Sequence, residues 1–361
     1  MSAKRMKTNS DEEKEGKKYK KNTKKKNKKK KIILKIFVIL LVILVILAGI
    51  AAGYVVSKFS LINHENIDKS EIEVNEGVGE QHGYKNILLL GVDSRSNSYT
   101  NTLSDSIMVV SINHDTKNVK IASVYRDSYL KFGNKFDKVT HAFMNGGAKA
   151  SLSAINTNLD LNLTEYVAIN FNVVVDVVDA VGGIDMEITS EEAKYINPYI
   201  TELNNVTGHK SAKITKAGEY HLDGVQAVAY ARIRYTAGGD YKRTERQRDV
   251  LNLVFQKVKT MNIAELNKLA DVVLKEISTN MSTKEILGLV AQVSSFDIEE
   301  TTGWPFDIKG YQPADVWYGA PVNLEKQVSE LHEFLFDEEE YEPSTTVKNI
   351  SNELIRKTGY K

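Results

Sequence analysis

The chain has 361 residues, with 48 Lys or Arg against 47 Asp or Glu, and its formal net charge is +1. With 42% hydrophobic and 26% charged residues it is not a wholly disordered chain, and 22 Gly and 5 Pro exclude collagen-like or low-complexity architectures. The near-zero charge conceals a division along the chain. Residues 1–31 hold 15 basic and four acidic side chains, whereas residues 36–361 hold 32 basic and 43 acidic ones. Segments of opposite charge indicate two different environments.

An uninterrupted apolar run follows the basic segment. Residues 36–57 are 22 consecutive uncharged residues, and a helix of that length crosses a bilayer core of about 30 Å. Because residues 24–31 are almost all Lys, the positive-inside rule predicts a cytoplasmic N-terminus and an extracellular remainder. A cleaved signal peptide is the alternative, although the run is long for one and has no break. We therefore expect a single-pass protein of the cell membrane, with residues 1–31 as a disordered cytoplasmic tail that contacts membrane lipids and residues 32–57 as the transmembrane helix.

The chain contains no cysteine. An extracellular domain without cysteine has no disulfide, no thiolate zinc site and no cysteine nucleophile, and it has no residue for lipoprotein acylation. Its stability must therefore come from the burial of apolar side chains.

Strands and helices are predicted to alternate beyond a polar, acidic stalk at residues 58–84. Apolar runs predict strands at 86–90, 106–112, 119–124, 166–170 and 184–188. Helical spacing predicts helices at 147–161, 171–181, 243–261 and 324–336, with two more between 265 and 293, the second opened by a capping box of Ser282 and Glu285. Residues 189–221 are expected to be irregular, and residues 224–235 to include a helical or extended approach to a strand. This order predicts an α/β layered domain at 85–337, with a central mixed β-sheet flanked by helices, and a loose tail at 338–361.

Two aspartates and an arginine are expected to meet at one edge of this sheet. Asp93 follows the first strand, Asp105 begins the second, and Arg126 and Asp127 follow the third. If the three strands are antiparallel neighbours, these positions share an edge. Simple turn formation is the alternative explanation, because Asp is frequent in turns.

Four arginines are gathered within fifteen residues: Arg232, Arg234, Arg243 and Arg246. The first two are spaced two apart, so on a strand both would point to one face. The last two share a helix face with Gln247 close to the helix start, where backbone N–H groups favour anions. The arginine guanidinium binds phosphate oxygens through two parallel hydrogen bonds, and a pair of carboxylates can coordinate Mg²⁺. The pattern predicts a ligand with two or more phosphates and a metal ion, while Arg248 on the other face is expected to be a surface residue.

Six strings in this order resemble the LytR-CpsA-Psr family from residue 85 to about residue 336: NILLLGVDSR, LSDSIMVVSIN, ASVYRDSYL, KVTHAFMNGG, YVAINFNVVVDVVDAVGGI, and LDGVQAVAYARIRY with GDYKRTERQ. The resemblance implies a phosphotransferase of cell wall biogenesis in Gram-positive envelopes. Such an enzyme takes a glycopolymer of the teichoic acid or capsular polysaccharide type from an undecaprenyl pyrophosphate carrier and attaches it to peptidoglycan. The pyrophosphate and Mg²⁺ that it implies agree with the aspartates and arginines.

The resemblance also assigns site residues. Asp93 and Asp105 match the metal-binding acidic positions, one of them being a candidate base, and Arg126 matches a catalytic arginine. The positions that hold the pyrophosphate are matched by Arg126, Lys138, Arg232, Arg234, Asp240, Arg243, Arg246 and Gln247. Two positions depart from the family pattern, because Leu103 replaces an arginine and Tyr125 replaces a proline. Loss of one phosphate contact at Leu103 would lower activity or alter the choice of polymer.

Two other functions would use the same residues. One is a metal-dependent pyrophosphatase of lipid-linked intermediates, and the other is a non-catalytic polymer-binding or regulatory membrane protein, which Leu103 favours. A nucleic-acid partner has no support, because the part after residue 36 is acidic overall. A polyprenyl substrate needs a long apolar tunnel, for which Phe143, residues 173–181 and the helix around Ile155 are candidates, although most such residues belong to a core.

Overall fold

A computed structural model of the chain describes residues 53–54, 57–92, 99 and 102–361. The span Leu61–Lys361 forms one compact unit. No helix within the described ranges is both long and apolar enough to cross a membrane. The predicted cytoplasmic tail and nearly all of the predicted transmembrane helix lie outside those ranges.

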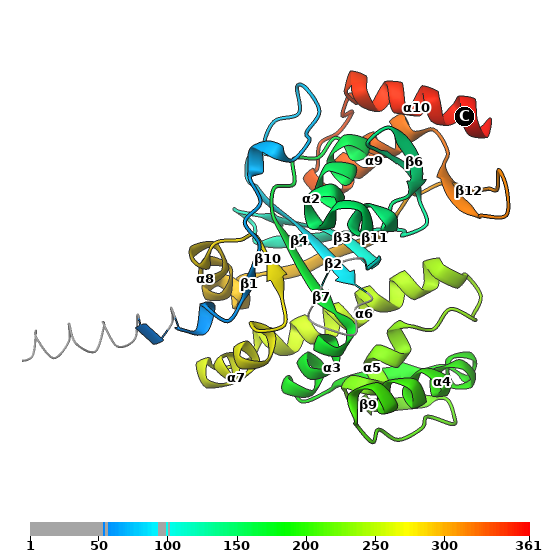
Figure 1. Ribbon diagram of the computed structural model, residues 1–361. Helices are drawn as coiled ribbons and strands as arrows, with labels where there is room; N and C mark the ends of the chain where they lie inside the picture. The colour runs from blue at the N-terminus through cyan, green and yellow to red at the C-terminus, as the bar shows by residue number, and fades with distance from the viewer. Residues whose placement is uncertain (1–52, 55–56, 93–98, 100–101) are drawn as a thin grey trace, which may run out of the picture. The chain divides into compact units, whose positions relative to one another are not determined.

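A mixed sheet, seven-stranded in the described part of the chain, forms the centre of this unit (Figure 1). Its strands in spatial order are β1 (Asn63–His64), β10 (Ser278–Thr279), β7 (Tyr166–Asn170), β2 (Tyr84–Val92), β3 (Ser104–Asn113), β4 (Asn118–Val124) and β11 (Asp297–Trp304). The predicted antiparallel pairing of β2 with β3 and of β3 with β4 is confirmed, while β7 runs parallel to β2 and β11 parallel to β4. Leu88, Val109 and Ala122 on the central strands are fully buried, as expected for a sheet covered on both faces.

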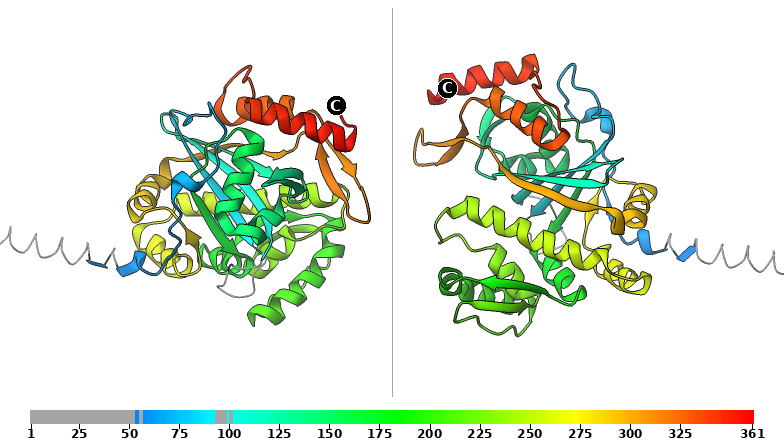
Figure 2. Two further views of the ribbon diagram at one scale, coloured as in Figure 1. Left: turned by 45° about the horizontal axis from the view of Figure 1, so that its top comes forward. Right: turned by 180° about the vertical axis from the view of Figure 1, so that it is seen from behind.

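Helices cover both faces of the sheet (Figure 2). One face is covered by α2 (Thr140–Leu159), α9 (Leu324–Phe336) and α10 (Thr345–Thr358). The other face is covered by α3 (Phe171–Ala180), α5 (Gly224–Ala231), α6 (Gly239–Lys259), α7 (Ile263–Val273) and α8 (Thr283–Gln292). The predicted α/β layered fold is therefore confirmed, and Ser282 and Glu285 do form the capping box that opens α8.

A smaller lobe lies beyond α3 and α5. It consists of α4 (Ser190–Thr207) and a separate hairpin of β8 (Ile184–Ile188) and β9 (Gly218–Leu222). The prediction that residues 189–221 are irregular was wrong, because a capping box of Thr189 and Glu192 starts α4 and Gly208, at φ 78°, ends it. Of the two approaches predicted after residue 224 the helical one is correct, since Asp223 and Gln226 form a second capping box that starts α5, but no strand follows at 232–235.

The segments at the two ends of the domain are more ordered than the sequence indicated. Within the predicted stalk, Ile72 is buried in the core and the Asn75 amide donates to Asp160 Oδ1 over 2.6 Å. Within the predicted loose tail, Val347 and Leu354 are buried on one face of α10. Both predictions, of a stalk up to residue 84 and of a loose tail from 338, are corrected by these packed apolar side chains.

Two short hairpins complete the domain near the end of β4. One is formed by β5 (Tyr129–Phe132) and β6 (Lys135–Lys138), the other by β12 (Ile308–Tyr311) and β13 (Tyr318–Pro321). Single turns of 3₁₀ helix occur at η1 (Lys69–Glu71) and η2 (Val293–Ser295). The second hairpin reaches the first through a bridge between Ser128 and Gly319.

Candidate active site

The antiparallel pairing of β3 with β4 brings Asp105 and Arg126 together. Asp105 is the second residue of β3, and Arg126 follows the last residue of β4 by two positions. Nη1 of Arg126 lies 2.5 Å from Oδ1 of Asp105. Nε of Arg126 lies 3.8 Å from Asp127 Oδ2 and 3.9 Å from Asp240 Oδ1. The convergence of Asp105 with Arg126 is confirmed, whereas Asp93 lies outside the described residues.

The first turn of α6 adds Asp240 as a shared carboxylate. Nη2 of Arg243 lies 2.9 Å from Asp240 Oδ2 and also donates to the backbone oxygen of Asp105 over 3.4 Å. Nε of Arg234 lies 3.7 Å from the other oxygen of Asp240. The helix can begin here because Gly238, at φ 88°, takes up a left-handed conformation at its N-cap. An acidic residue in the first turn is also favoured by the helix dipole.

Lys138 at the end of β6 closes the group, with its Nζ 2.9 Å from Asp127 Oδ1. We call the resulting set the polar cluster: Asp105, Arg126, Asp127, Lys138, Arg234, Asp240 and Arg243. It combines four cationic with three anionic side chains. It is reachable from solvent, because the Arg234 side chain is 41% exposed and that of Asp240 27%.

Burial and mutual repulsion act on the two inner arginines. For Arg126, burial alone would lower the pKa, but the carboxylates of Asp105, Asp127 and Asp240 outweigh it and raise the pKa. For Arg243, burial is the main cause that lowers the pKa, Asp240 opposes it, and the like charges of Arg234 and Arg126 add to the fall, with a net pKa of about 10. The Nε atoms of Arg126 and Arg243 are buried without a hydrogen-bond partner among the described residues. A bound anion would satisfy both nitrogens and relieve the repulsion.

Two of the arginines predicted to hold pyrophosphate lie apart from this cluster. Arg232 follows α5, where its Nη2 is 3.2 Å from Glu202 Oε1 and its guanidinium lies 5.3 Å from the ring centre of Tyr199. Arg246 is 2% exposed and uses all three nitrogens within the protein. Its acceptors are Glu192 Oε1 at 2.9 Å, the backbone oxygen of Ile233 at 3.2 Å and Thr236 Oγ1 at 2.9 Å. The expectation that Arg232 and Arg234 share the face of a strand was wrong, because the chain there is a helix end and a turn.

The two residues after Arg246 are both largely buried. Gln247 was predicted to hold the pyrophosphate; it lies in the wall of an apolar cavity, and its side-chain oxygen is buried without a partner in the described part of the chain. Arg248 was predicted to be a surface residue, but it is only 9% exposed, and burial lowers its pKa. Because α6 packs against the sheet as well as against β8, both of these helix faces are covered. Leu103, in place of the family's arginine, is half-buried directly before β3.

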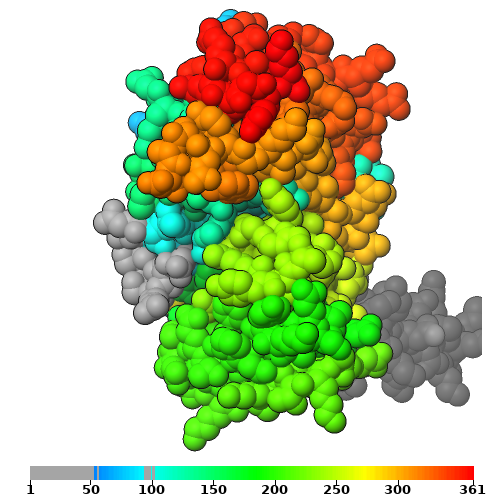
Figure 3. All heavy atoms as spheres, turned by 90° about the vertical axis from the view of Figure 1, so that its right-hand side faces the viewer, coloured from blue at the N-terminus to red at the C-terminus, as the bar shows by residue number. Residues whose placement is uncertain are grey.

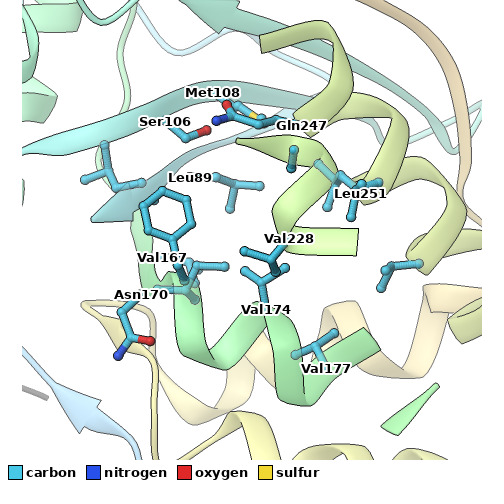
Figure 4. Close-up of a pocket in the computed structure, with 17 residues that line it drawn as sticks. Leu89, Ser106, Met108, Val167, Asn170, Val174, Val177, Val228, Gln247 and Leu251 are labelled. Atoms are coloured by element: carbon cyan, nitrogen blue, oxygen red, sulfur yellow. The ribbon is translucent and has the colours of Figure 1, made fainter. Parts of the chain in front are cut away.

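An apolar cavity of about 180 Å³ lies on the face of the sheet that α3, α5 and α6 cover (Figure 4). It lies between strands β2, β3 and β7 and helices α3, α5 and α6, and its apolar lining includes Leu89, Met108, Val167, Val174, Val228 and Leu251. Ser106 and Gln247 contribute polar groups to its wall. Ser106 follows Asp105 along β3 and Gln247 lies one turn beyond Arg243 on α6, so wall residues of the cavity are close in the chain to members of the polar cluster.

The cavity partly matches the predicted lipid tunnel. Val174 and Val177 of the predicted stretch 173–181 do line it. Phe143 and Ile155 do not, because α2 covers the opposite face of the sheet and both residues belong to the core on that side.

The family model of the LytR_cpsA_psr family matches residues 52–330, more than three quarters of the chain. This chain belongs to the LytR_cpsA_psr family. It is 28% identical to the polyisoprenyl-teichoic acid–peptidoglycan teichoic acid transferase TagT of Bacillus subtilis (strain 168), over 74% of this chain and 84% of TagT. It is 31% identical to the transferase TagU of Bacillus cereus (strain AH820), over 72% of this chain and 81% of TagU.

The fold is also that of a solved LytR_cpsA_psr structure. The structure of TagT with bound octaprenyl pyrophosphate lipid superposes with a TM-score of 0.52 at 22% identity, and covers 82% of this chain and all of that one. The family resemblance predicted from the six sequence strings is thus confirmed.

The sequence placed Asp127 at this edge without giving it a partner, and it did not reveal the part of Glu192. Asp127 contacts both Arg126 and Lys138, and its only signal was its place directly after Arg126. Glu192 holds Arg246 from 54 residues away, and only its place in a capping box could be read from the sequence.

Proposed function

We propose that this protein transfers a glycopolymer from a polyprenyl pyrophosphate carrier to peptidoglycan, as a phosphotransferase. The observation that carries the proposal is the polar cluster with its three arginines, together with an apolar cavity whose wall residues Ser106 and Gln247 lie next to Asp105 along β3 and one turn beyond Arg243 on α6. A polyprenyl pyrophosphate has the same two parts, a dianionic or more highly charged head joined to a hydrocarbon chain. The names of TagT and TagU, both teichoic acid transferases, support this function.

The polar cluster suits the pyrophosphate head group. Guanidinium groups bind phosphate oxygens through paired, charge-assisted hydrogen bonds. Arg126, Arg234 and Arg243 reach the cluster from the end of β4, the turn after α5 and the first turns of α6. Because the unpaired Nε atoms of Arg126 and Arg243 are already buried, binding a phosphate there adds hydrogen bonds with little further loss of hydration.

The transfer is a displacement at phosphorus. A hydroxyl oxygen of the acceptor sugar forms a bond to the phosphorus that bears the glycopolymer, and the bond from that phosphorus to the lipid phosphate breaks. The electron pair leaves with undecaprenyl phosphate, and the hydroxyl proton passes to water, because Asp105 is paired with Arg126 and assigned to the metal ion. Arg126, Arg234 and Arg243 stabilise the negative charge on the transferring and leaving phosphates.

We further propose Mg²⁺ as the cofactor. Asp105 supplies a hard carboxylate oxygen at the polar cluster with its side chain 15% exposed, which fits this ion. Within the described ranges no three or more His, Asp or Glu side chains are grouped as a metal site, so Asp93 and phosphate oxygens would complete the coordination. When bound, the ion supplies positive charge opposite the pyrophosphate. The predicted topology supports a place for this reaction at the outer face of the cell membrane.

One product assay separates this function from its two alternatives. The full-length protein in detergent is incubated with a lipid-pyrophosphate-linked glycan, Mg²⁺ and peptidoglycan fragments. We expect a covalent adduct of glycan and peptidoglycan. Free phosphate-terminated glycan would instead support a pyrophosphatase, and tight binding without turnover would support a non-catalytic polymer-binding protein.

Arg126→Ala provides the matched test of the site. Loss of one charge-stabilising donor lowers kcat by roughly 10²–10³-fold in comparable sites. We expect a loss of this size without unfolding, and unchanged turnover in Arg356→Ala, which removes an exposed arginine of α10. Full activity of Arg126→Ala would remove this residue from the site.

A further inference from the structure

We propose that the β12–β13 hairpin is the binding surface for the acceptor, and that the indole face of Trp317 supports the sugar rings of a peptidoglycan glycan strand. This inference rests on the proposed function, because it names where the second substrate of that reaction lies. The surface is centred on Trp317, whose side chain is 42% exposed.

The indole ring of Trp317 lies against the hairpin. Gly310 and Gly319 are directly opposite each other on β12 and β13. A Cβ atom on Gly310 would stand 2.7 Å from Nε1 of Trp317, and one on Gly319 would stand 3.3 Å from its Cη2. The two glycines thus leave the space that the ring fills. One side of the indole ring packs on the backbone of Gly310 and Gly319. The exposed part of the ring is therefore held in a fixed orientation.

The hairpin is joined directly to the polar cluster. The backbone N–H of Gly319 donates to the backbone oxygen of Asp127 over 3.0 Å, and Nζ of Lys138 lies 5.9 Å from the ring centre of Tyr318. Trp317 is two residues from Gly319, which corresponds to about 6.6 Å along a strand. A short oligosaccharide on Trp317 therefore reaches the phosphates at Arg126.

The hairpin is also held in place from behind. The ring of Tyr129 packs against those of Tyr311 and Tyr318, with centres 5.2 and 4.7 Å apart, and the Tyr360 hydroxyl donates to the backbone oxygen of Gly310 over 2.7 Å. A platform fixed in this way loses little conformational freedom when it binds a ligand.

The position of the hairpin agrees with the direction from which the acceptor must approach. In a displacement at phosphorus, the attacking and leaving oxygens lie roughly in line on opposite sides. The leaving lipid occupies the cavity below β2, β3 and β7, whereas β12 continues from β11 at the other edge of the sheet. Figure 3 shows the hairpin, in orange, on one side of a hollow whose other side is formed by α6, in yellow-green.

The chemistry of the surface favours an uncharged glycan over a membrane. The C–H groups on one face of a pyranose ring carry partial positive charge and pack on the negative face of an aromatic ring. The predicted membrane anchor precedes β1, and β1 and β11 are the two edge strands of the sheet. At the usual strand spacing these edges are about 29 Å apart, so the hairpin that follows β11 is far from β1.

Tryptophan fluorescence tests binding without turnover. The chain has two tryptophans, and Trp304 is fully buried, so a ligand-dependent change reports Trp317. We expect a saturable shift in emission when peptide-free oligosaccharides from peptidoglycan are added to the full chain in detergent, and no shift in Trp317→Phe. A shift caused only by reconstitution into anionic phospholipid nanodiscs, with none from the oligosaccharides, would overturn the inference in favour of a membrane contact.

Steady-state kinetics test the same residue in the reaction. In Trp317→Ala we expect the KM for the peptidoglycan acceptor to rise about tenfold, with kcat at saturating acceptor and the KM for the lipid-linked donor unchanged. Trp317→Tyr keeps an aromatic face and should restore most of the acceptor affinity. Val290→Ala, at an exposed apolar position on α8 away from the hairpin, should match the wild type.

The two proposals fail in distinguishable ways. If transfer proceeds and Trp317→Ala leaves the acceptor KM unchanged, this inference is wrong and the transferase function stands. If no variant transfers glycan but the oligosaccharides still shift the emission of Trp317, the saccharide site stands and the transferase function is wrong.

Discussion

Arg243 and Arg246 stand one turn apart on α6 and are almost equally buried, at 3% and 2% exposure, yet their surroundings differ completely. Arg243 faces a cluster open to solvent, shares Asp240 with Arg126 and Arg234, and has an Nε without a partner in the described part of the chain. Arg246 has every nitrogen engaged by the protein. Both residues are arginines on the same helix, so residue type alone does not distinguish them. The groups that contact each guanidinium determine whether it is free to bind phosphate.

Glu192 is the partner that sets Arg246 apart. Its carboxylate closes the capping box of α4 by accepting from the backbone and the hydroxyl group of Thr189. Burial would raise the pKa of Glu192, but these hydrogen bonds together with Arg246 lower it, so the carboxylate stays charged. Arg246 thereby ties α6 to α4 and to the turn that carries Arg234. We assign Arg246 a positioning role and the polar cluster the contact with phosphate.

Arg246→Ala gives the largest expected effect on stability. Removing one partner of a buried ion pair leaves the other charge uncompensated and costs about 3–5 kcal/mol. We expect a loss of this size in the free energy of unfolding, measured with urea, and none in Arg356→Ala. A variant with normal stability but no turnover would show instead that Arg246 contacts the substrate.

Arg234→Ala gives the largest expected effect on catalysis with little change in stability. Its side chain is 41% exposed and its distance to Asp240 is 3.7 Å, so the fold depends little on it. Loss of one phosphate contact should lower turnover by roughly 10²–10³-fold. Lys242→Ala, which removes a nearby exposed charge on α6, is the control and should keep full activity. Equal activity of the two variants would contradict the division between the arginines.

Val174→Phe tests whether the apolar cavity, in contrast to the polar cluster, binds the hydrocarbon chain of the substrate. The added ring fills part of the cavity beside the polar cluster, where Val174 is labelled in Figure 4. We expect the KM for a long-chain polyprenyl donor to rise about tenfold, equivalent to about 1.4 kcal/mol, and the KM for a short-chain donor to change less. Val206→Phe places the same ring on an exposed position and should leave both values unchanged. Equal effects on donors of both lengths would argue against lipid in this cavity.

Arg232→Ala gives the smallest expected effect. Arg232 forms a partially exposed ion pair with Glu202, and pairs of this kind contribute about 0–1 kcal/mol to the free energy of unfolding. Among the described residues, its contacts are with Glu202 and Tyr199 and not with the polar cluster. Turnover and donor KM should therefore stay close to wild type. A loss as large as that of Arg234→Ala would restore Arg232 to the phosphate site, where the sequence placed it.

The sequence predicted the parts of the site that depend on neighbouring strands. The apolar runs of β2, β3 and β4 predicted three neighbouring antiparallel strands. This pairing in turn predicted that Asp105 and Arg126 lie close together. The pattern after residue 224 was misread because alternating arginines resemble a strand, although Asp223 and Gln226 carried a helix-start signal. The role of Arg246 could not be predicted, since Glu192 lies 54 residues away on another helix. The cavity could not be predicted either, because three strands and three helices line it.

A structure of the protein with a bound polyprenyl pyrophosphate tests the central claim most directly. We expect both phosphates to contact Arg126, Arg234 and Arg243, the hydrocarbon chain to occupy the cavity beside Val174, and Arg246 to stay paired with Glu192. Phosphates bound at Arg232 and Arg246, with the polar cluster closed on its own carboxylates, would contradict it.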